Sequence, residues 1–244
     1  MNLYTKNIGK TFSGVNVLRN VNFTLEPGEV HALVGENGAG KSTFVKILSG
    51  VYTPTDGDIF LDNKKIKINT PIAAQKNGVS LIHQEPQSFS HLSVAENIFM
   101  GHMDGNNFSR VKWKDINKSS EKILSSIGLK IDPKNIMEGL SIADQQMIEI
   151  AGALSKNSKI LIMDEPTSPL TPNEVGKLFD IVNQLKAQGM AIIFISHRLE
   201  EIRSIANRVT IFRDGDLITT QKINEITNEE IIKYMIGRSI EDID

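Results

Sequence analysis

The sequence predicts an α/β protein with a mainly parallel sheet, an N-terminal antiparallel β part and an inserted helical subdomain. An apolar run at residues 30–34 is followed by a glycine-rich loop and a short helical pattern at residues 43–48, which is typical of a strand–loop–helix unit. Apolar runs at residues 79–83, 159–163 and 191–196 predict further buried strands. Strands that alternate with helices favour a parallel sheet.

The order of these patterns predicts one domain, residues 1–244, built in three parts. A core lobe comprises residues 1–85, where short strands alternate with turns, and residues 159–220, which end in a hairpin at Asp214-Gly215. A helical subdomain comprises residues 86–158, and a C-terminal helical tail comprises residues 221–244. Within these parts the periodicity predicts a loop at residues 101–109 and helices at residues 94–100, 114–127, 144–154 and 174–188.

Composition gives only a broad class. The 244 residues are 40% hydrophobic and 23% charged, with a net charge of −2 and no cysteine. The absence of cysteine fits a reducing compartment, and the acidic balance gives no basic field for nucleic acid. The apolar runs are much shorter than the ~20 residues of a membrane-spanning helix, and the N-terminal residues do not have the pattern of a secretory signal. These features predict a cytosolic globular protein.

The segment "LVGENGAGKST" fits the phosphate-binding pattern G-x-x-x-x-G-K-[ST]. Glycines let successive backbone N–H groups face a phosphate, and the following helix N-terminus adds partial positive charge. Lys41 supplies a full charge, and the Ser42 hydroxyl can ligate Mg²⁺. The alternative is a plain glycine-rich turn. We expect a nucleoside triphosphate to be held by Gly35, Glu36, Asn37, Gly38, Ala39, Gly40, Lys41, Ser42 and Thr43.

Polar residues follow the other predicted strands. Gln84 follows the run at 79–83, Asp164 and Glu165 follow the run at 159–163, and His197 follows the run at 191–196. Because ligands bind beyond the carboxyl ends of parallel strands, we expect these side chains to meet the phosphate loop. Singly, each has a simpler interpretation: a solvated loop residue for Gln84, a capping residue for Asp164 and a structural histidine for His197.

Phosphoryl transfer to water assigns a role to each group. Asp164 and Ser42 suit Mg²⁺, with Asp164 acting through water, and the Gln84 amide oxygen can reach either the metal or the attacking water. Glu165 suits orienting or deprotonating the attacking water. His197 can contact the γ-phosphate and hold Glu165. The set predicts an ATP hydrolase, with Glu165, His197 and Gln84 as catalytic residues.

With "ILIMDEPTSPLT" and "ISHRLEEI", the chain resembles the ATP-binding subunit of an ATP-binding cassette (ABC) transporter over essentially its full length. The resemblance implies a phosphate-loop NTPase core, with ATP and Mg²⁺ as cofactors. It places Phe12 where the family stacks an aromatic side chain on adenine, although a core aromatic is the alternative. It places Ser141, in "LSIADQQMIEIA", where the family's signature segment completes the nucleotide site of a facing cassette.

The motifs "GENGAGKST", "HQEP", "LSIADQQM" and "FRDG" are similar to those of the ribose, galactose and xylose importers. In that group one chain usually contains two cassettes, and "EEIIKYMIGRSIEDID" resembles the junction after the first. The resemblance therefore implies an ATPase that powers import of a simple sugar and is the first of two cassettes. Alternatives are an ABC ATPase for another small solute such as a nucleoside, or a non-transport ABC ATPase.

The signature segment departs from the family's usual Leu-Ser-Gly-Gly-Gln. Ile142, Ala143 and Asp144 replace the two glycines and the glutamine, and Thr171 stands where the family commonly has Asp. Side chains at the glycine positions are expected to weaken the contact with a facing nucleotide. Ser141 and Asp144 also fit a helix-capping box, and both interpretations can hold together. We expect one competent and one compromised site in a cassette pair.

The resemblance implies partners that the chain itself does not contain. These are a second cassette, in tandem or as a homodimer, transmembrane permease subunits and, indirectly, an extracytoplasmic sugar-binding protein. The implied location is the cytoplasmic face of the plasma membrane, as a peripheral subunit. In the family a permease helix docks after Gln84, which makes Phe89 a candidate contact. Two other classes stay open, a nucleic-acid-associated ATPase and a phosphate-loop kinase or GTPase.

Overall fold

A computed structural model describes residues 1–100 and 112–237 of the chain. The loop expected at 101–109 and the last seven residues of the expected cassette junction lie outside the described residues. Within the described residues, no helix combines the length and the apolar character that crossing a membrane requires.

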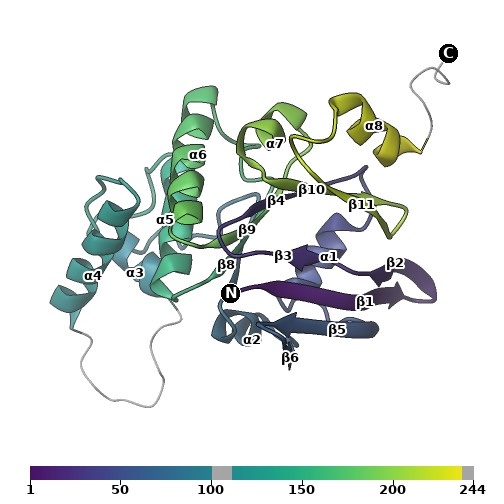
Figure 1. Cartoon of the computed structure of the whole chain (residues 1–244). Coiled ribbons are helices and arrows are strands. Elements are labelled where there is room, and N and C mark those ends of the chain that lie inside the picture. Colours follow the sequence, from purple (N-terminus) through teal and green to yellow (C-terminus); the bar gives the residue numbers. More distant parts are fainter. Residues whose placement is uncertain (101–111, 238–244) are drawn as a thin grey trace.

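The strands of the described residues form one extended sheet with an antiparallel part and a parallel part (Figure 1). Their order is β6-β5-β1-β2-β11-β10-β4-β9-β8-β7, and β3 pairs with β1. The antiparallel part contains β1 (Leu3–Phe12), β2 (Val15–Val21), β3 (Thr24–Leu25), β5 (Asp56–Leu61) and β6 (Lys64–Ile66). The second part contains β4 (Val30–Val34), β7 (Val79–Ile82), β8 (Ile160–Asp164), β9 (Ala191–Ile195), β10 (Arg208–Arg213) and β11 (Asp216–Lys222).

The parallel strands are apolar on both faces because helices cover both faces. Side chains that alternate along a strand point to opposite faces, so each strand supplies two cores. Ala32 and Phe194 pack with one buried cluster, whereas Leu33 and Ile193 pack with the other. This explains why these strands are continuous apolar runs in the sequence.

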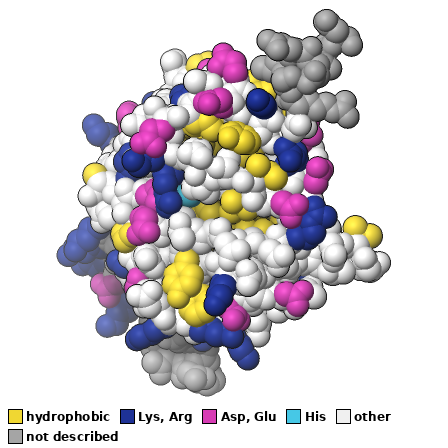
Figure 2. Space-filling model, turned by 45° about the vertical axis from the view of Figure 1, so that its right-hand side comes forward, with side chains coloured by type: hydrophobic (Ala, Val, Ile, Leu, Met, Phe, Trp, Pro, Cys, Tyr) yellow, Lys and Arg dark blue, Asp and Glu magenta, His cyan; other side chains and the backbone are white. Residues whose placement is uncertain are grey.

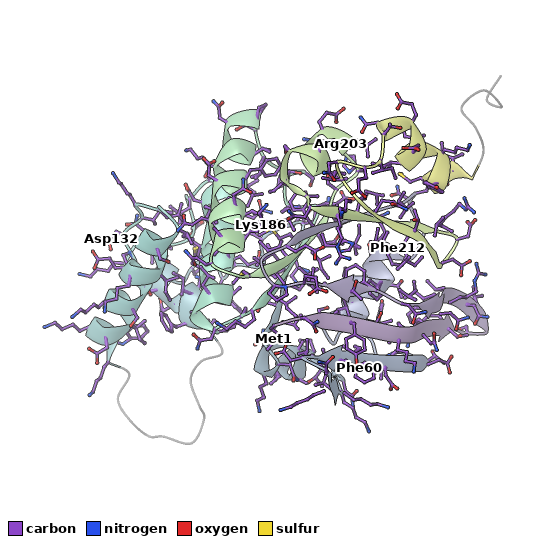
Figure 3. The ribbon with its side chains drawn as sticks, in the orientation of Figure 1. Met1, Phe60, Asp132, Lys186, Arg203 and Phe212 are labelled. Atoms are coloured by element: carbon purple, nitrogen blue, oxygen red, sulfur yellow. The ribbon has the colours of Figure 1, made fainter. Side chains whose placement is uncertain are left out.

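Helix α1 (Lys41–Leu48) lies between the antiparallel strands and one face of the parallel strands (Figure 1). Its Phe44 ring lies 5.4 Å from Phe23, which precedes β3, and 5.5 Å from Phe212 on β10. Phe212, labelled in Figure 3, therefore joins α1 to the sheet. The helix that begins at the glycine-rich loop is anchored on both sides.

The opposite face of the parallel strands packs against a second group of helices. The first three, which follow β7 in the chain and contact one another, are α3 (Val94–Phe99), α4 (Trp113–Ser126) and α5 (Ile142–Ser155). The others are α6 (Pro172–Ala187), α7 (Leu199–Ile205) and α8 (Asn228–Ile236). A separate short helix, α2 (Pro71–Lys76), precedes β7 in the chain. In Figure 3, Asp132, in the loop after α4, lies at the left edge, and Phe60, on β5, lies near the lower edge among the antiparallel strands. The division into core lobe, helical subdomain and tail stays our proposal.

We predict that Phe44→Ala lowers the free energy of unfolding by about 3–5 kcal/mol, because it leaves a cavity between two layers of the core. Chemical denaturation monitored by circular dichroism measures this change. The matched control is Val15→Ala, at a side chain that is 65% exposed, for which we expect a change within about 0.5 kcal/mol. Equal effects of the two substitutions would contradict the packing described here.

Candidate functional site

The carboxyl ends of three parallel strands meet around one residue of β9. Ile195, the last residue of β9, pairs with Leu33 of β4 on one side and with Asp164 of β8 on the other. On the far side of β8, Ile82 of β7 pairs with Met163. The glycine-rich loop, the paired carboxylates, His197 and Gln84 therefore all leave the sheet at the same edge.

The loop between β4 and α1 requires glycine at two close approaches. A Cβ atom at Gly35 would lie 2.3 Å from the carbonyl oxygen of Phe212, and one at Gly40 would lie 2.6 Å from a methyl group of Leu18. Both glycines have positive φ, 152° and 105°, as has Gly38 at 84°. The loop is thus wound tightly against β10 and β2, in a conformation that other residues rarely adopt.

The loop lines an open cavity of about 340 Å³. Lys41 donates hydrogen bonds from Nζ to the carbonyl oxygens of Gly35 and Glu36, at 2.6 and 3.0 Å, which fixes its charge beside the loop. Burial lowers the pKa of Lys41, while the charges of Glu165 and Asp164 act to raise it. The residues that line the cavity are Val17, Asn37, Gly38, Ala39, Gly40, Lys41, Ser42, Thr43, Glu165 and Ile195.

Asp164 and Glu165 stand in different environments although they are neighbours in the chain. Burial, and next the charge of Glu165, raises the pKa of Asp164, while the cations Lys46 and Lys41 act to lower it. A half-buried carboxylate near cations suits a metal shell. Glu165 has a positive φ of 47°, and its N–H donates to the carbonyl oxygen of Ile195 at 3.0 Å. Such a conformation in a non-glycine residue is uncommon and often occurs at functional sites.

The structure brings His197 to Glu165 and Gln84 to the segment after Glu165. Nδ1 of His197 lies 3.4 Å from a carboxylate oxygen of Glu165, and the imidazole is largely exposed. The side-chain amide of Gln84 donates to the Ser168 hydroxyl at 3.1 Å. Neither His197 nor Gln84 lines the loop cavity itself. His197 therefore contacts one of the two carboxylates, and Gln84 contacts the segment that follows them.

Two candidate nucleotide contacts lie apart from the loop cavity. Phe12 is 37% exposed and lies 5.1 Å from the Tyr52 ring, with the Lys10 ammonium 4.8 Å from its centroid. Ser141 is the N-cap residue of α5, and its hydroxyl accepts from the N–H of Asp144 at 3.1 Å. Neither lines the cavity, so their roles stay predictions.

The beginning of α5 forms only half of the expected capping box. The Asp144 carboxylate accepts from the Ser141 hydroxyl at 2.9 Å, rather than from the backbone N–H of Ser141. Ile142 is 50% exposed, whereas Ala143 is buried. A bulky apolar side chain therefore stands on the surface at a position where the family has glycine.

Sequence reasoning missed Glu201, which joins two segments of the site. One carboxylate oxygen of this buried residue accepts from the Thr167 hydroxyl at 2.8 Å and from the Ser196 hydroxyl at 2.7 Å. Thr167 follows Glu165 by two residues, and Ser196 precedes His197. Glu201 thus fixes the segments that position these two side chains. Glu201 lies within the motif "ISHRLEEI", but two acidic residues at the beginning of a helix are also typical of a solvent-exposed surface.

Sequence reasoning also missed Val17, which comes from β2 and lines the cavity. The carbonyl oxygen of Val17 lies close to Gly215: a Cβ atom on Gly215 would lie 2.5 Å from it. The N–H of Gly215 in turn donates to the carbonyl oxygen of Ala39 in the loop, at 3.2 Å. The one sequence signal for a role of Val17 at the nucleotide site was its position five residues after Phe12. A valine in a strand ordinarily indicates packing alone.

Residues 18–168 match the family profile described as "ABC transporter". The chain belongs to the ABC transporter family. The match spans more than half of the chain and includes the loop, both carboxylates and the signature segment. It confirms the family resemblance that the sequence motifs indicate.

Relatives support the same assignment over almost the whole cassette. "Ribose import ATP-binding protein RbsA 2" of Streptomyces avermitilis is 45% identical over 241 residues, covering 99% of this chain and 48% of its own length. "Ribose import ATP-binding protein RbsA" of Clostridium tetani is 47% identical, covering 98% and 48%. A putative ribose/galactose/methyl galactoside import ATP-binding protein of Agrobacterium fabrum is 46% identical, covering 98% and 47%. The chain spans about half the length of these relatives.

Solved structures agree with the fold. A nucleotide-free ATP-binding cassette from an ABC transporter superposes with a TM-score of 0.82 at 26% identity, covering 100% of this chain and 98% of that chain. The cbiO1 protein of Clostridium perfringens, part of the transporter complex cbiONQ, superposes with a TM-score of 0.81 at 26% identity, covering 99% and 96%. The predicted fold class, an α/β cassette with an antiparallel N-terminal part, is confirmed.

We predict that Gly35→Ala lowers the free energy of unfolding by about 3 kcal/mol or more, because the new methyl group meets the Phe212 backbone. Gly38→Ala is the matched control, since Gly38 has positive φ but open space around it. We expect the control to cost only about 1–2 kcal/mol, the strain of the left-handed conformation. Urea unfolding measures both, and a control as damaging as Gly35→Ala would contradict the close approach.

We predict that Glu201→Ala destabilises the cassette by about 2–4 kcal/mol, because two buried hydroxyl donors lose their acceptor. Glu201→Gln retains an acceptor oxygen and should lose less. Glu200→Ala, at the exposed neighbour, should stay within about 0.5 kcal/mol of the unmodified chain. Thermal unfolding compares the three, and a silent Glu201→Ala would show that the hydroxyls do not depend on it.

Proposed function

We propose that this cassette binds ATP with Mg²⁺, hydrolyses it together with a second cassette, and thereby powers import of a simple sugar through separate permease subunits. The observation that carries the proposal is the meeting of the glycine-rich loop with Asp164 and Glu165 at the end of β9. Backbone N–H groups, one ammonium and two carboxylates at one sheet edge suit a triphosphate with its cation.

The loop residues bind and orient the triphosphate. The Lys41 ammonium offsets the charge of the β- and γ-phosphates, and the loop N–H groups between Gly35 and Thr43 cradle them. Mg²⁺, when bound, offsets further charge on the phosphate oxygens. The residues that suit it are Ser42 through its hydroxyl, Asp164 through water, and Gln84 through its amide oxygen. The donor set fits this cation, which prefers oxygen ligands.

Glu165 is the proposed general base. It accepts a proton from water as the water oxygen attacks the γ-phosphorus, and the bond from that phosphorus to the β–γ bridging oxygen breaks, giving ADP and phosphate. His197, 3.4 Å from Glu165, orients the carboxylate and donates to a γ-phosphate oxygen. Phe12 is the proposed adenine-stacking residue. Glu201 acts only through the segments that hold Glu165 and His197.

A second cassette is proposed to complete the site. In a head-to-tail pair, Ser141 of this chain would face the partner's nucleotide, with Ile142 and Ala143 weakening the approach. The partner's signature segment would serve the loop of this chain. The altered signature segment therefore supports a pair with one competent and one compromised nucleotide site. Such a pair is expected when two unlike cassettes occur in one protein. The relatives are about twice as long as this chain, which leaves room for a second cassette.

The permease is proposed to dock in the groove between α5 and the segment after Gln84. That groove has a volume of about 260 Å³, and Phe89 at its rim is 56% exposed. Docking there would place the cassette at the cytoplasmic face of the membrane, with an extracytoplasmic binding protein delivering the sugar. Basic and acidic side chains lie interspersed over the face shown in Figure 2, which favours these partners over nucleic acid.

We predict that the purified chain binds ATP but hydrolyses it slowly at every protein concentration, because its own signature segment is compromised. Adding an unlike cassette with an intact Leu-Ser-Gly-Gly-Gln segment should raise turnover at least about tenfold. Phosphate release measured over a range of concentrations tests this, with Glu165→Gln as the inactive control. Activity per molecule that rises with concentration of this chain alone would contradict the half-site proposal. No turnover in any pairing would contradict the proposed hydrolysis.

A further inference from the structure

Helix α5 presents a row of polar and small residues to the groove between the helices and β7. Gln145, Glu149, Gly152 and Lys156 follow one another at intervals of three or four residues, so they lie on one face of the helix. All four line the groove. The remaining faces of α5 are largely buried in the core. The polar row is therefore directed to the groove.

Glu149 is the acidic residue of this groove, and half of its carboxylate has no partner. The Oε2 atom is inaccessible to solvent and forms no hydrogen bond within the described residues. Burial is the main cause that raises the pKa of Glu149 to about 7, while a backbone hydrogen bond from His83 and the charge of Lys156 act to lower it. A buried unpaired carboxylate oxygen costs stability, so the described part of the chain leaves an unsatisfied acceptor at this place.

The backbone of His83, near the catalytic edge of the sheet, acts on the Glu149 carboxylate. The backbone N–H of His83 donates to Glu149, and His83 is the residue before Gln84. The charge of Asp164 also acts on the His83 imidazole. One carboxylate therefore contacts both the groove and the segment that bears the proposed metal ligand Gln84.

We propose that Glu149 is the anchoring site for a lysine or arginine side chain that the permease segment inserts into this groove. The proposal rests on the proposed function, which places the permease in the same groove. A cation supplies the donor that Oε2 lacks and compensates the buried charge.

A basic side chain fits the groove better than an acidic or purely apolar one. Among the described residues that line the groove, the ionisable ones are His83, Glu149 and Lys156. Lys156 is near enough for its charge to act on Glu149, but the two form no ion pair within 4.0 Å in the described residues. Within the described residues, Oε2 of Glu149 is thus left without a donor. Lys156 is the alternative partner for Glu149 within the chain, and its substitution therefore provides a matched control.

The first arm of the test uses the isolated chain and compares Glu149→Gln with Lys156→Gln. Replacing an unpaired buried carboxylate by a neutral amide should raise the melting temperature by about 2–4 °C at about pH 8. Lys156→Gln should not raise it. A melting temperature that falls in Glu149→Gln would show that the charge is already compensated within the chain, and would overturn the proposal.

The second arm uses the chain, with its companion cassette where one is required, assembled with the permease subunits of its own transporter in liposomes. The readout is the ratio of permease-stimulated to basal ATP hydrolysis. Glu149→Gln should reduce this ratio at least about tenfold, and Lys156→Gln should leave it within about twofold. Combining Glu149→Lys with exchange of the permease's basic residue for glutamate should restore the ratio.

The outcomes separate the two proposals. If permease does not stimulate the unmodified chain, the proposed function fails, and this inference fails with it. If permease stimulates the unmodified chain and Glu149→Gln equally, only the anchoring role is overturned. An equal loss of stimulation in Lys156→Gln and Glu149→Gln would show that Glu149 acts as the partner of Lys156. That result would overturn the proposed contact with a basic residue of the permease.

Discussion

The functional edge of this protein depends on the parallel pairing of β9 with its two neighbours. Ile195 pairs with Leu33 on one side and Asp164 on the other, so the loop and the carboxylates begin at the same height in the sheet. A shift of β8 by one residue would exchange its two faces, burying Asp164 differently and separating Glu165 from His197. The two hydrophobic clusters oppose such a shift, because the residues of these strands other than His31 and Asp164 are apolar and pack into one cluster or the other.

The rigid core also supports strained and costly local features. Gly35 and Gly40 approach other backbone and side-chain atoms closely, and Glu165 has a left-handed conformation. These features persist because α1 is held between two layers and because Glu201 joins the segments before His197 and after Glu165. At Glu149, in contrast, one carboxylate oxygen stays uncompensated within the described residues. In our account, contacts within the chain support the strained nucleotide site, whereas a basic residue of the permease pairs with the Glu149 carboxylate in the groove.

The sequence predicts what is encoded locally. The bounds of β4, Val30–Val34, match the apolar run, and the loop pattern predicts the cavity that Lys41 helps to line. Contacts between distant segments have no local signal. Val17 reaches the cavity only because β2 pairs beside β11, and the Glu201 carboxylate meets Thr167 across 34 residues of chain. The helix cap at Ser141 was predictable, but the route of its hydrogen bonds was not.

The most direct test of the account is calorimetric binding of ATP to the purified chain, with and without Mg²⁺. We expect binding that weakens at least about tenfold without Mg²⁺ and at least about a hundredfold in Lys41→Ala, because this ammonium is the fixed positive charge of the loop. Binding that is absent, or that is equal in the unmodified chain and Lys41→Ala, would contradict the assignment of the loop cavity as the nucleotide site.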